Sequence, residues 1–253
     1  MFQVTAIRAF KDNYIWLLRK GAQAVVVDPG DCQPVLAALE RAGLTLAAIL
    51  VTHHHADHQG GVAGLRERFA VPVYAPAAES ITALSRPLHG GETIRLDALD
   101  ESFTVIPVPG HTAGHIAFHG GGALFCGDTL FAGGCGRVFE GTMAQMVTSL
   151  ARLAALPDAT ACYCAHEYTE ANLRFALAVE PGNAALRARV QAVAAARARG
   201  EATVPFTLPG ERATNPFLRC GEPEVIAAAR REGAESDDAL AVFTALREWK
   251  NRF

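Results

Sequence analysis

The sequence predicts an α/β domain followed by a smaller, all-helical domain. Over the first two thirds of the 253-residue chain, short apolar runs alternate with helix-like segments, for example "AVVVDPG" at 24–30 before "QPVLAALERAG" at 33–43. Beyond about residue 167, every periodic segment has helical spacing and none alternates as a strand does. We therefore expect an α/β domain at residues 1–166 and a helical domain at residues 167–253.

The expected elements follow from apolar pattern and from turn residues. Strands are expected at residues 2–7, 14–18, 24–30, 47–52, 71–75, 103–109, 123–127 and 161–165. Helices of the α/β domain are expected at residues 33–43, where Gly43 is a stop signal, at 60–69, and at 142–156, before Pro157. Helices of the second domain are expected at residues 171–180, 183–200, 222–233 and 237–250.

Composition excludes several classes of protein. Hydrophobic residues make up 50% of the chain, enough for a sizeable core, and the net charge of −3 gives no basic surface for nucleic acid. No apolar run approaches the ~18 residues of a membrane span, and the first residues lack a secretory signal pattern. The six cysteines form no CxxC pair, so we expect reduced thiols and a cytoplasmic protein. Nothing in the sequence requires more than a monomer.

The segment "THHHADH" at 52–58 directly follows the apolar run "AAILV". In an extended segment, side chains two positions apart point the same way, so His53 and His55 can reach one metal ion together. Asp57 and His58 follow immediately and can turn toward a second ion. Imidazole and carboxylate groups suit zinc, iron and manganese.

Three further apolar runs end close to a metal-capable residue, namely His111, Asp128 and His166. Functional residues in open α/β folds cluster beyond the carboxyl ends of strands. A lone histidine after a strand is more often structural than a ligand, but the combined set favours a metal centre. Five histidines and two aspartates suffice for two ions if one aspartate bridges them and solvent completes the coordination.

The remaining histidines are left out of this set. His54 points away from its two neighbours, and His89 and His119 lack a strand-end context. His115, four residues after His111, either supports a ligand or is purely structural, and the structural role is favoured.

The motif "HHHADH", with His111, Asp128 and His166 in the same order, resembles the HxHxDH signature of the metallo-β-lactamase superfamily. The resemblance implies an αββα sandwich of two mixed sheets with helices outside and the site at one edge. It also implies which residues share an ion: His53, His55 and His111 hold one, Asp57, His58 and His166 hold the other, and Asp128 bridges them.

A closer resemblance, to the hydroxyacylglutathione hydrolase (glyoxalase II) family, extends over nearly the whole chain. It rests on "DNYIWLL", "VVVDPG", "THHHADHQGG", "PGHTAGHI", "GDTLFAGGCGR", "HEYT" and "TNPFLR" and on the helical C-terminal domain. It implies hydrolysis of S-D-lactoylglutathione to glutathione and a 2-hydroxy acid, the second step of methylglyoxal detoxification.

The implied cofactors are two divalent metal ions, zinc in the first place, with iron or manganese as alternatives. The ions would hold the attacking hydroxide and polarise the acyl carbonyl. Asp57 can orient the hydroxide or accept its proton. Asp28, which ends "VVVD", either fixes a ligand histidine or simply shapes a turn.

The resemblance also implies a glutathione-binding set: Arg137, Tyr168, Arg247 and Lys250. Arg247 and Lys250 lie three residues apart, so they share one face of a helix, where two cations also suit the helix C-terminus. Relatives often have lysine at the position of Arg137 and tyrosine at that of Phe139, so contacts to the peptide differ here.

Alternatives of other classes stay open. A lactonase, a β-lactamase or an RNA-processing nuclease could use the same ligand set, although the charge and the absence of a signal pattern disfavour the last two. A persulfide dioxygenase would use one iron and fewer ligands. A non-catalytic metal-binding module would show a decayed site, and no ligand is missing.

Overall fold

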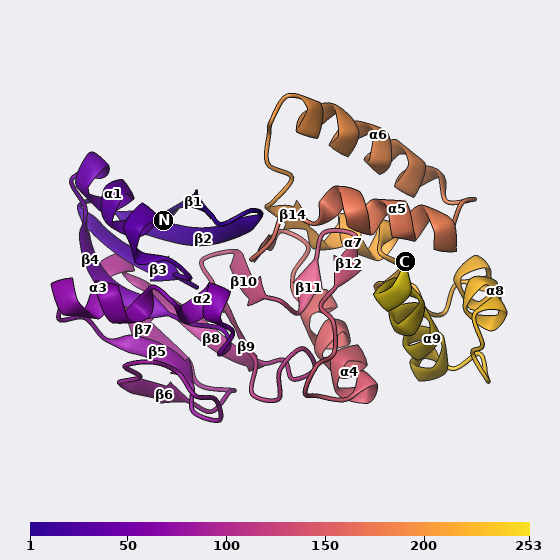
Figure 1. Ribbon diagram of the computed structural model, residues 1–253, viewed down its shortest axis with the longest axis horizontal. Helices are drawn as coiled ribbons and strands as arrows, with labels where there is room; N and C mark the ends of the chain where they lie inside the picture. Colours follow the sequence, from indigo (N-terminus) through magenta and orange to yellow (C-terminus); the bar gives the residue numbers. More distant parts are fainter. The chain divides into compact units, whose positions relative to one another are not determined.

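The computed structural model describes residues 1–253 and forms two compact units (Figure 1). Unit 1 comprises Met1–Val108 and Thr112–Gly127, and unit 2 comprises Pro109–His111 and Asp128–Phe253. The domain boundary expected between residues 166 and 167 stays a prediction.

Unit 1 contains a six-stranded mixed sheet. Its strands, in spatial order, are β1 (Gln3–Ala9), β2 (Asn13–Lys20), β3 (Gln23–Val27), β4 (Thr45–Leu50), β5 (Val73–Pro76) and β6 (Arg86–Leu88). Strands β1 to β3 are antiparallel to one another, whereas β3 to β6 run parallel. The parallel part brings the carboxyl ends of β3 and β4 side by side, which places the segments that follow them at one sheet edge.

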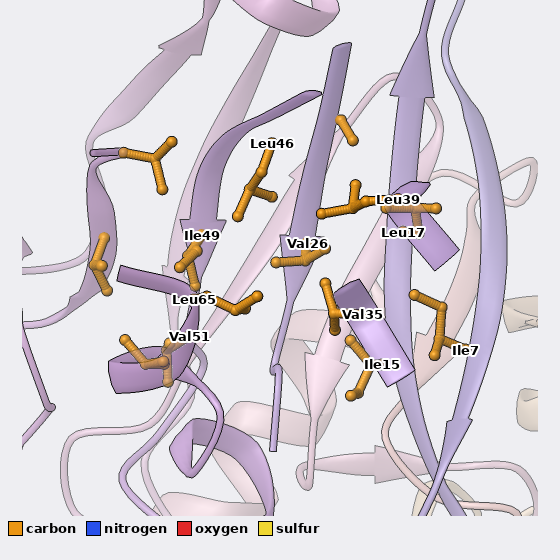
Figure 2. Packing of buried hydrophobic residues seen from close by; sticks show 14 of the residues in the cluster. Ile7, Ile15, Leu17, Val26, Val35, Leu39, Leu46, Ile49, Val51 and Leu65 are labelled. Atoms are coloured by element: carbon orange, nitrogen blue, oxygen red, sulfur yellow. The ribbon is translucent and has the colours of Figure 1, made fainter. Parts of the chain in front are cut away.

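Helices α1 (Cys32–Ala42) and α3 (Val62–Arg68) cover one face of this sheet. Val35 and Leu39 of α1 and Leu65 of α3 pack on alternate residues of the strands, including Leu17 and Val26 (Figure 2). The side chain of Asp31 caps the start of α1 by accepting from the Gln33 N–H, and Gly43 ends the helix in the left-handed conformation.

The other strands of unit 1 form an antiparallel array in the order β10 (Ala123–Gly127), β9 (Ile116–Gly120), β8 (Glu101–Pro107) and β7 (Thr93–Leu96). The short helices η1 (Asp97–Leu99) and α2 (Ala56–Gln59) complete the unit. Phe103, Phe118 and Phe125 of this array are fully buried, which anchors the strand that leads to Asp128.

Unit 2 is mostly helical. Its helices are α4 (Met143–Ala154), α5 (Thr169–Val179), α6 (Ala184–Ala198), α7 (Leu208–Thr214), η2 (Pro216–Leu218), α8 (Pro223–Arg231) and α9 (Ala239–Arg252). Strands β11 (Leu130–Phe131) and β12 (Gly134–Cys135) form a small hairpin, and β13 (Ala161–Cys164) pairs antiparallel with β14 (Phe206–Thr207). Side chains of α5, α7 and α9 bond to the hairpin that follows Asp128.

The expected strands and helices exist, with ends displaced by a few residues, but the expectation of no strand beyond residue 167 is wrong. Phe206 pairs with Cys162 in the β13–β14 ladder. Strand β14 has only two residues, too few to show the alternation of apolar and polar residues from which strands are predicted. The short strands β6, β7, β11 and β12 escaped prediction for the same reason, and the longer β9 was also missed.

All six cysteines are free thiols, as expected, and five of them are buried. Burial raises the pKa of Cys162 to about 12 and raises that of Cys135 as well. The protein has no helix that combines the length and apolar character needed to cross a membrane.

Replacing Leu65 by alanine should lower the free energy of unfolding by about 3 kcal/mol, because the change leaves a cavity beneath α3. Leu65 is fully buried against the sheet. Urea unfolding followed by circular dichroism measures the effect. Leu240→Ala, at a leucine that is 40% exposed, should change the same quantity by no more than about 0.5 kcal/mol. Equal effects of the two changes would contradict this packing.

Candidate metal and substrate site

The histidine motif lies in the segment that follows β4. His53 is fully buried, and its Nε2 lies 3.1 Å from Nδ1 of His55. The chain then enters the one-turn helix α2, which carries Asp57 and His58. The first pair thus lies close together, as the spacing predicted, whereas the helical turn that carries the second pair was not predicted.

Asp28 holds this segment in place from the end of β3. The buried carboxylate accepts from the Thr52 N–H at 2.7 Å and from the Thr52 hydroxyl at 2.8 Å. Its Oδ2 also lies 3.0 Å from Nδ1 of His58. Because a carboxylate only accepts, His58 carries its proton on Nδ1 and keeps the lone pair of Nε2 for another partner. Of the two roles expected for Asp28, the contacts are those of a residue that fixes a histidine.

Nε2 of His58 lies 3.5 Å from Oδ2 of Asp57, and the same oxygen accepts from Nδ2 of Asn13 at 2.9 Å. In the groups suited to a metal ion, the ligand atoms of His53 and His58, and those of Asp57 and His58, lie within 4.8 Å of each other. Unit 1 therefore presents four clustered metal-type ligands. Asn13 was not singled out from the sequence, although it lies in the quoted motif "DNYIWLL".

His54 and His115 were left out of the predicted ligands, but a ring nitrogen of His54 lies within 4.8 Å of one of His55, so the expectation that His54 points away from its neighbours is wrong. Nδ1 of His54 lies 3.0 Å from Oε2 of Glu79, and this oxygen also accepts from the His54 N–H. The other oxygen of Glu79, Oε1, accepts from the Gly114 N–H at 2.9 Å. His115 is fully buried and stacks on the ring of His53, with centroids 4.5 Å apart. Glu79 and His115 thus shape the loops around the motif, and no local pattern marked Glu79 for that role.

Unit 2 supplies the other three predicted ligands. Nε2 of His111 lies 3.4 Å from Oδ2 of Asp128, and Nε2 of His166 lies 3.4 Å from Oδ1 of the same residue. Each carboxylate oxygen therefore faces a different imidazole. These separations are long for hydrogen bonds but equal the ~3.4 Å expected between two ligands on one tetrahedral zinc ion.

A hydrogen bond made by Nδ1 of His111 leaves Nε2 as the nitrogen that can bind a metal ion. Nδ1 of His111 lies 2.7 Å from the carbonyl oxygen of Arg137, so the proton sits on Nδ1 and Nε2 keeps its lone pair. Gly136, the residue before Arg137, lets this segment lie close to the backbone of Asp128. A Cβ at Gly136 would lie 1.9 Å from the carbonyl oxygen of Asp128, so no larger residue fits there.

Two of the four predicted substrate-binding residues lie beside these ligands. The ring of Tyr168 stacks on His166, with centroids 4.6 Å apart and an angle of 4° between the planes. The ring of Phe139 meets His111 edge-on, and the Arg137 guanidinium lies over that ring at 5.2 Å. Phe139 is 58% exposed, so an apolar surface and a cation flank His111.

The other two, on α9, bind parts of unit 2. Arg247 is buried and donates to the carbonyl oxygen of Cys135 at 2.9 Å, while its Nε lacks a hydrogen-bond partner. Nζ of Lys250 donates to Oδ1 of Asn172 at 2.6 Å. Burial, together with the neighbouring Arg247, lowers the pKa of Lys250 to about 8. Both cations therefore have structural contacts that the sequence did not predict.

Two family models together match residues 9–253 of the chain. Residues 9–166 match the model of the metallo-beta-lactamase superfamily, and residues 167–253 match the model described as the hydroxyacylglutathione hydrolase C-terminus. A relative from Dechloromonas aromatica, named hydroxyacylglutathione hydrolase, is 58% identical over 267 residues and covers 100% of each chain.

The chain belongs to the hydroxyacylglutathione hydrolase family. The expected fold and family are thereby confirmed, including the helical region after the metallo-β-lactamase fold.

Solved structures agree with the assigned fold. The crystal structure of ETHE1 from Myxococcus xanthus matches 99% of this chain and 98% of its own, with a TM-score of 0.67 and 24% identity, which supports the fold alone. The protein TTHA1623, solved in a di-iron-bound form, is 32% identical over 65% of this chain and 91% of its own, with a TM-score of 0.54.

The donor sets of both units fit divalent metal ions. Each consists of imidazole and carboxylate groups, and the protonated nitrogens of His58 and His111 are bonded to oxygen acceptors. This arrangement directs the remaining lone pairs away from the supporting groups. The family and the donor chemistry together make this a metal-binding protein.

Changing Asp28 to asparagine should weaken divalent metal binding about 10- to 100-fold, because the amide no longer fixes the His58 tautomer. Competition with a chromophoric chelator measures the affinity. Asp31→Asn, which alters the cap of α1 close by, serves as the control and should bind metal as the unchanged protein does. Equal affinity in Asp28→Asn would contradict the assigned role of this carboxylate.

Proposed function

We propose that this enzyme hydrolyses S-2-hydroxyacylglutathione thioesters, with S-D-lactoylglutathione as its substrate, to glutathione and a 2-hydroxy acid. The observation that carries the proposal is the full-length 58% identity to a protein named hydroxyacylglutathione hydrolase, with that family's C-terminal region present at residues 167–253. The reaction would be the second step of methylglyoxal detoxification. We propose that the protein is a monomer and that it works in the reducing cytoplasm, a location that the six free thiols support.

The proposed centre holds two divalent metal ions, with zinc as the metal and iron or manganese as alternatives. His53, His55 and His111 would hold one ion, His58, His166 and Asp57 the other, and Asp128 would bridge them. Supporting this, the two oxygens of Asp128 face different imidazoles, a disposition suited to a bridge. The protein TTHA1623, which is 32% identical, was solved in a di-iron-bound form, and this supports a proposal of two ions for the present protein.

In the proposed reaction, water adds to the acyl carbon, the C–S bond breaks, and sulfur leaves as the glutathione thiolate. When bound, the two ions supply a hydroxide nucleophile at neutral pH and polarise the thioester carbonyl. Asn13 orients the Asp57 carboxylate through the 2.9 Å hydrogen bond, so that Asp57 can accept a proton from the attacking water. A thiolate is a good leaving group, so no strong general acid is required.

The proposed glutathione site consists of Arg137, Tyr168, Arg247 and Lys250, and residues 167–253 form the binding domain. Arginine can grip a peptide carboxylate through two parallel hydrogen bonds. Arg137 is exposed beside His111, whereas Arg247 is buried, and its Nε makes no hydrogen bond within the protein. Lys250 keeps donor capacity beyond its bond to Asn172, since an ammonium group has three N–H bonds.

The test is the loss of the ultraviolet absorbance of the thioester with S-D-lactoylglutathione, alongside metal content per chain. Turnover with close to two metal ions per chain is expected. Turnover of a lactone, a β-lactam or a phosphodiester in place of the thioester would overturn the proposed substrate but leave the metal centre. If the enzyme instead binds one iron per chain and consumes oxygen when a glutathione persulfide is added, a dioxygenase would be favoured.

Changing Asp128 to alanine should abolish turnover and reduce the bound metal to one ion or none, because the proposed bridge is lost. Metal analysis after dialysis, with the thioester assay, measures both effects. Asp158→Ala is a suitable control, since Asp158 pairs with Arg212 on the surface. Full activity and two ions in Asp128→Ala would refute the bridging role.

Changing Lys250 to methionine should raise KM for the thioester about tenfold at pH 7 and remove a pH dependence. The ammonium is charged below its pKa of about 8 and neutral above it. In the unchanged enzyme, KM should therefore rise as pH increases through 8, as the attraction for a glutathione carboxylate is lost. In Lys250→Met, KM should be high and flat over that range.

The control for this prediction is Lys20→Met, at a surface lysine paired with Asp100. KM is obtained from initial rates measured at several pH values between about 6.5 and about 9.5. This pH range extends about 1.5 pH units on either side of the pKa of Lys250. An unchanged KM profile in Lys250→Met would remove this residue from the proposed substrate site.

A further inference from the structure

The β11–β12 hairpin is held through its backbone by side chains from the helices of unit 2. Hydrogen bonds reach the peptide groups of five consecutive residues: the Phe131, Ala132, Gly134 and Cys135 carbonyl oxygens and the Gly133 N–H. The side chains that make them come from α5, α7, α9 and the residue that begins η2. A two-residue hairpin has little intrinsic stability, so these bonds determine its position.

Glu211 and Asn215 are the centre of this network, and both are fully buried. Oε2 of Glu211 accepts from the Gly133 N–H at 2.8 Å and from Nδ2 of Asn215 at 2.9 Å. Nδ2 of Asn215 also donates to the Gly134 carbonyl oxygen at 2.9 Å. The buried charge of Glu211 is paired with Arg189 of α6.

The hairpin is directly continuous with proposed metal ligands. Asp128 lies two residues before it, and the Gly136 N–H that follows it donates to the Thr129 carbonyl oxygen at 3.1 Å. The next residue, Arg137, accepts the proton of His111 Nδ1 on its carbonyl oxygen. A shift of the hairpin would therefore move the Asp128 carboxylate and the acceptor that fixes His111.

We propose that Glu211 and Asn215 are positioning residues for the metal centre, acting through the hairpin on Asp128 and His111. This inference rests on the proposed function, because it assumes that these two residues bind metal. It gives the helical region a second role besides binding glutathione: it holds two metal ligands at the separation that a metal ion requires. Neither Glu211 nor Asn215 contacts a predicted ligand itself.

A matched pair elsewhere in unit 2 separates positioning from general stability. The buried carboxylate of Glu180 accepts from Nε of Arg219 at 2.8 Å and from Nη2 of Arg219 at 2.7 Å. This pair is also buried and also joins helical segments, but it makes no bond to the hairpin. Changing Glu180 to glutamine should therefore destabilise the fold without disturbing the metal ligands.

The experiment compares the unchanged enzyme with Glu211→Gln, Asn215→Ala and Glu180→Gln. Apo protein is titrated with Zn²⁺ against a chromophoric chelator, and urea unfolding is measured in parallel. Both hairpin variants should bind Zn²⁺ about tenfold more weakly, the size of effect seen when the support of a metal ligand is lost. Glu180→Gln should bind within about twofold of the unchanged enzyme.

Zn²⁺ affinity in both hairpin variants equal to that of the unchanged enzyme would overturn the inference while leaving the proposed function intact. Equal weakening in Glu180→Gln would also overturn it, since any loss of stability would then suffice. No Zn²⁺, iron or manganese binding by the unchanged enzyme would overturn the proposed function and this inference together. If Asn215→Ala fails to fold, Glu211→Gln decides the result, because it preserves the shape of the side chain.

Discussion

A neutral imidazole can offer a lone pair from only one ring nitrogen, and its other nitrogen carries a proton that needs an acceptor. Much of the architecture around the proposed centre serves this constraint. The Asp28 carboxylate takes the proton of His58 Nδ1, and the Arg137 carbonyl oxygen takes that of His111 Nδ1. Asp28 directly follows β3 and Arg137 follows β12. The ends of these two strands must therefore be placed accurately.

The position of Asp28 has an energetic cost that its contacts offset. Its backbone adopts φ 52°, in the left-handed region that residues other than glycine rarely occupy. Such a conformation costs about 1 kcal/mol or more. The carboxylate receives in return two hydrogen bonds from Thr52 and one from His58, all buried. The strain at Asp28 is thus compensated by hydrogen bonds to Thr52, which follows β4 at the start of the histidine motif.

Sequence patterns pointed to the proposed ligands and to one residue that supports them, Asp28, but not to the other supporting residues. The ligands could be predicted because HxHxDH is a local motif and because His111, Asp128 and His166 follow apolar strands. Glu79 and Glu211 could not be predicted, because each acts on a segment far away in the chain, as in the bond from Gly133 to Glu211. Single acidic residues on otherwise ordinary segments show no periodicity that distinguishes them from surface charges.

The supporting bonds also explain why the ligands of each unit can lie in buried surroundings. His53 and His58 of unit 1, and His111, Asp128 and His166 of unit 2, are all less than 10% exposed, and burying such groups is unfavourable unless their polar atoms are satisfied. Backbone and carboxylate partners satisfy some of those atoms, and metal ions would satisfy others. Metal binding and folding are then coupled, because ions that bind only the assembled ligand set stabilise the fold by mass action. The helical residues that hold the β11–β12 hairpin would therefore affect stability more in the metal-loaded protein than in the apo protein, since only there does the exact placement of Asp128 and His111 contribute binding energy.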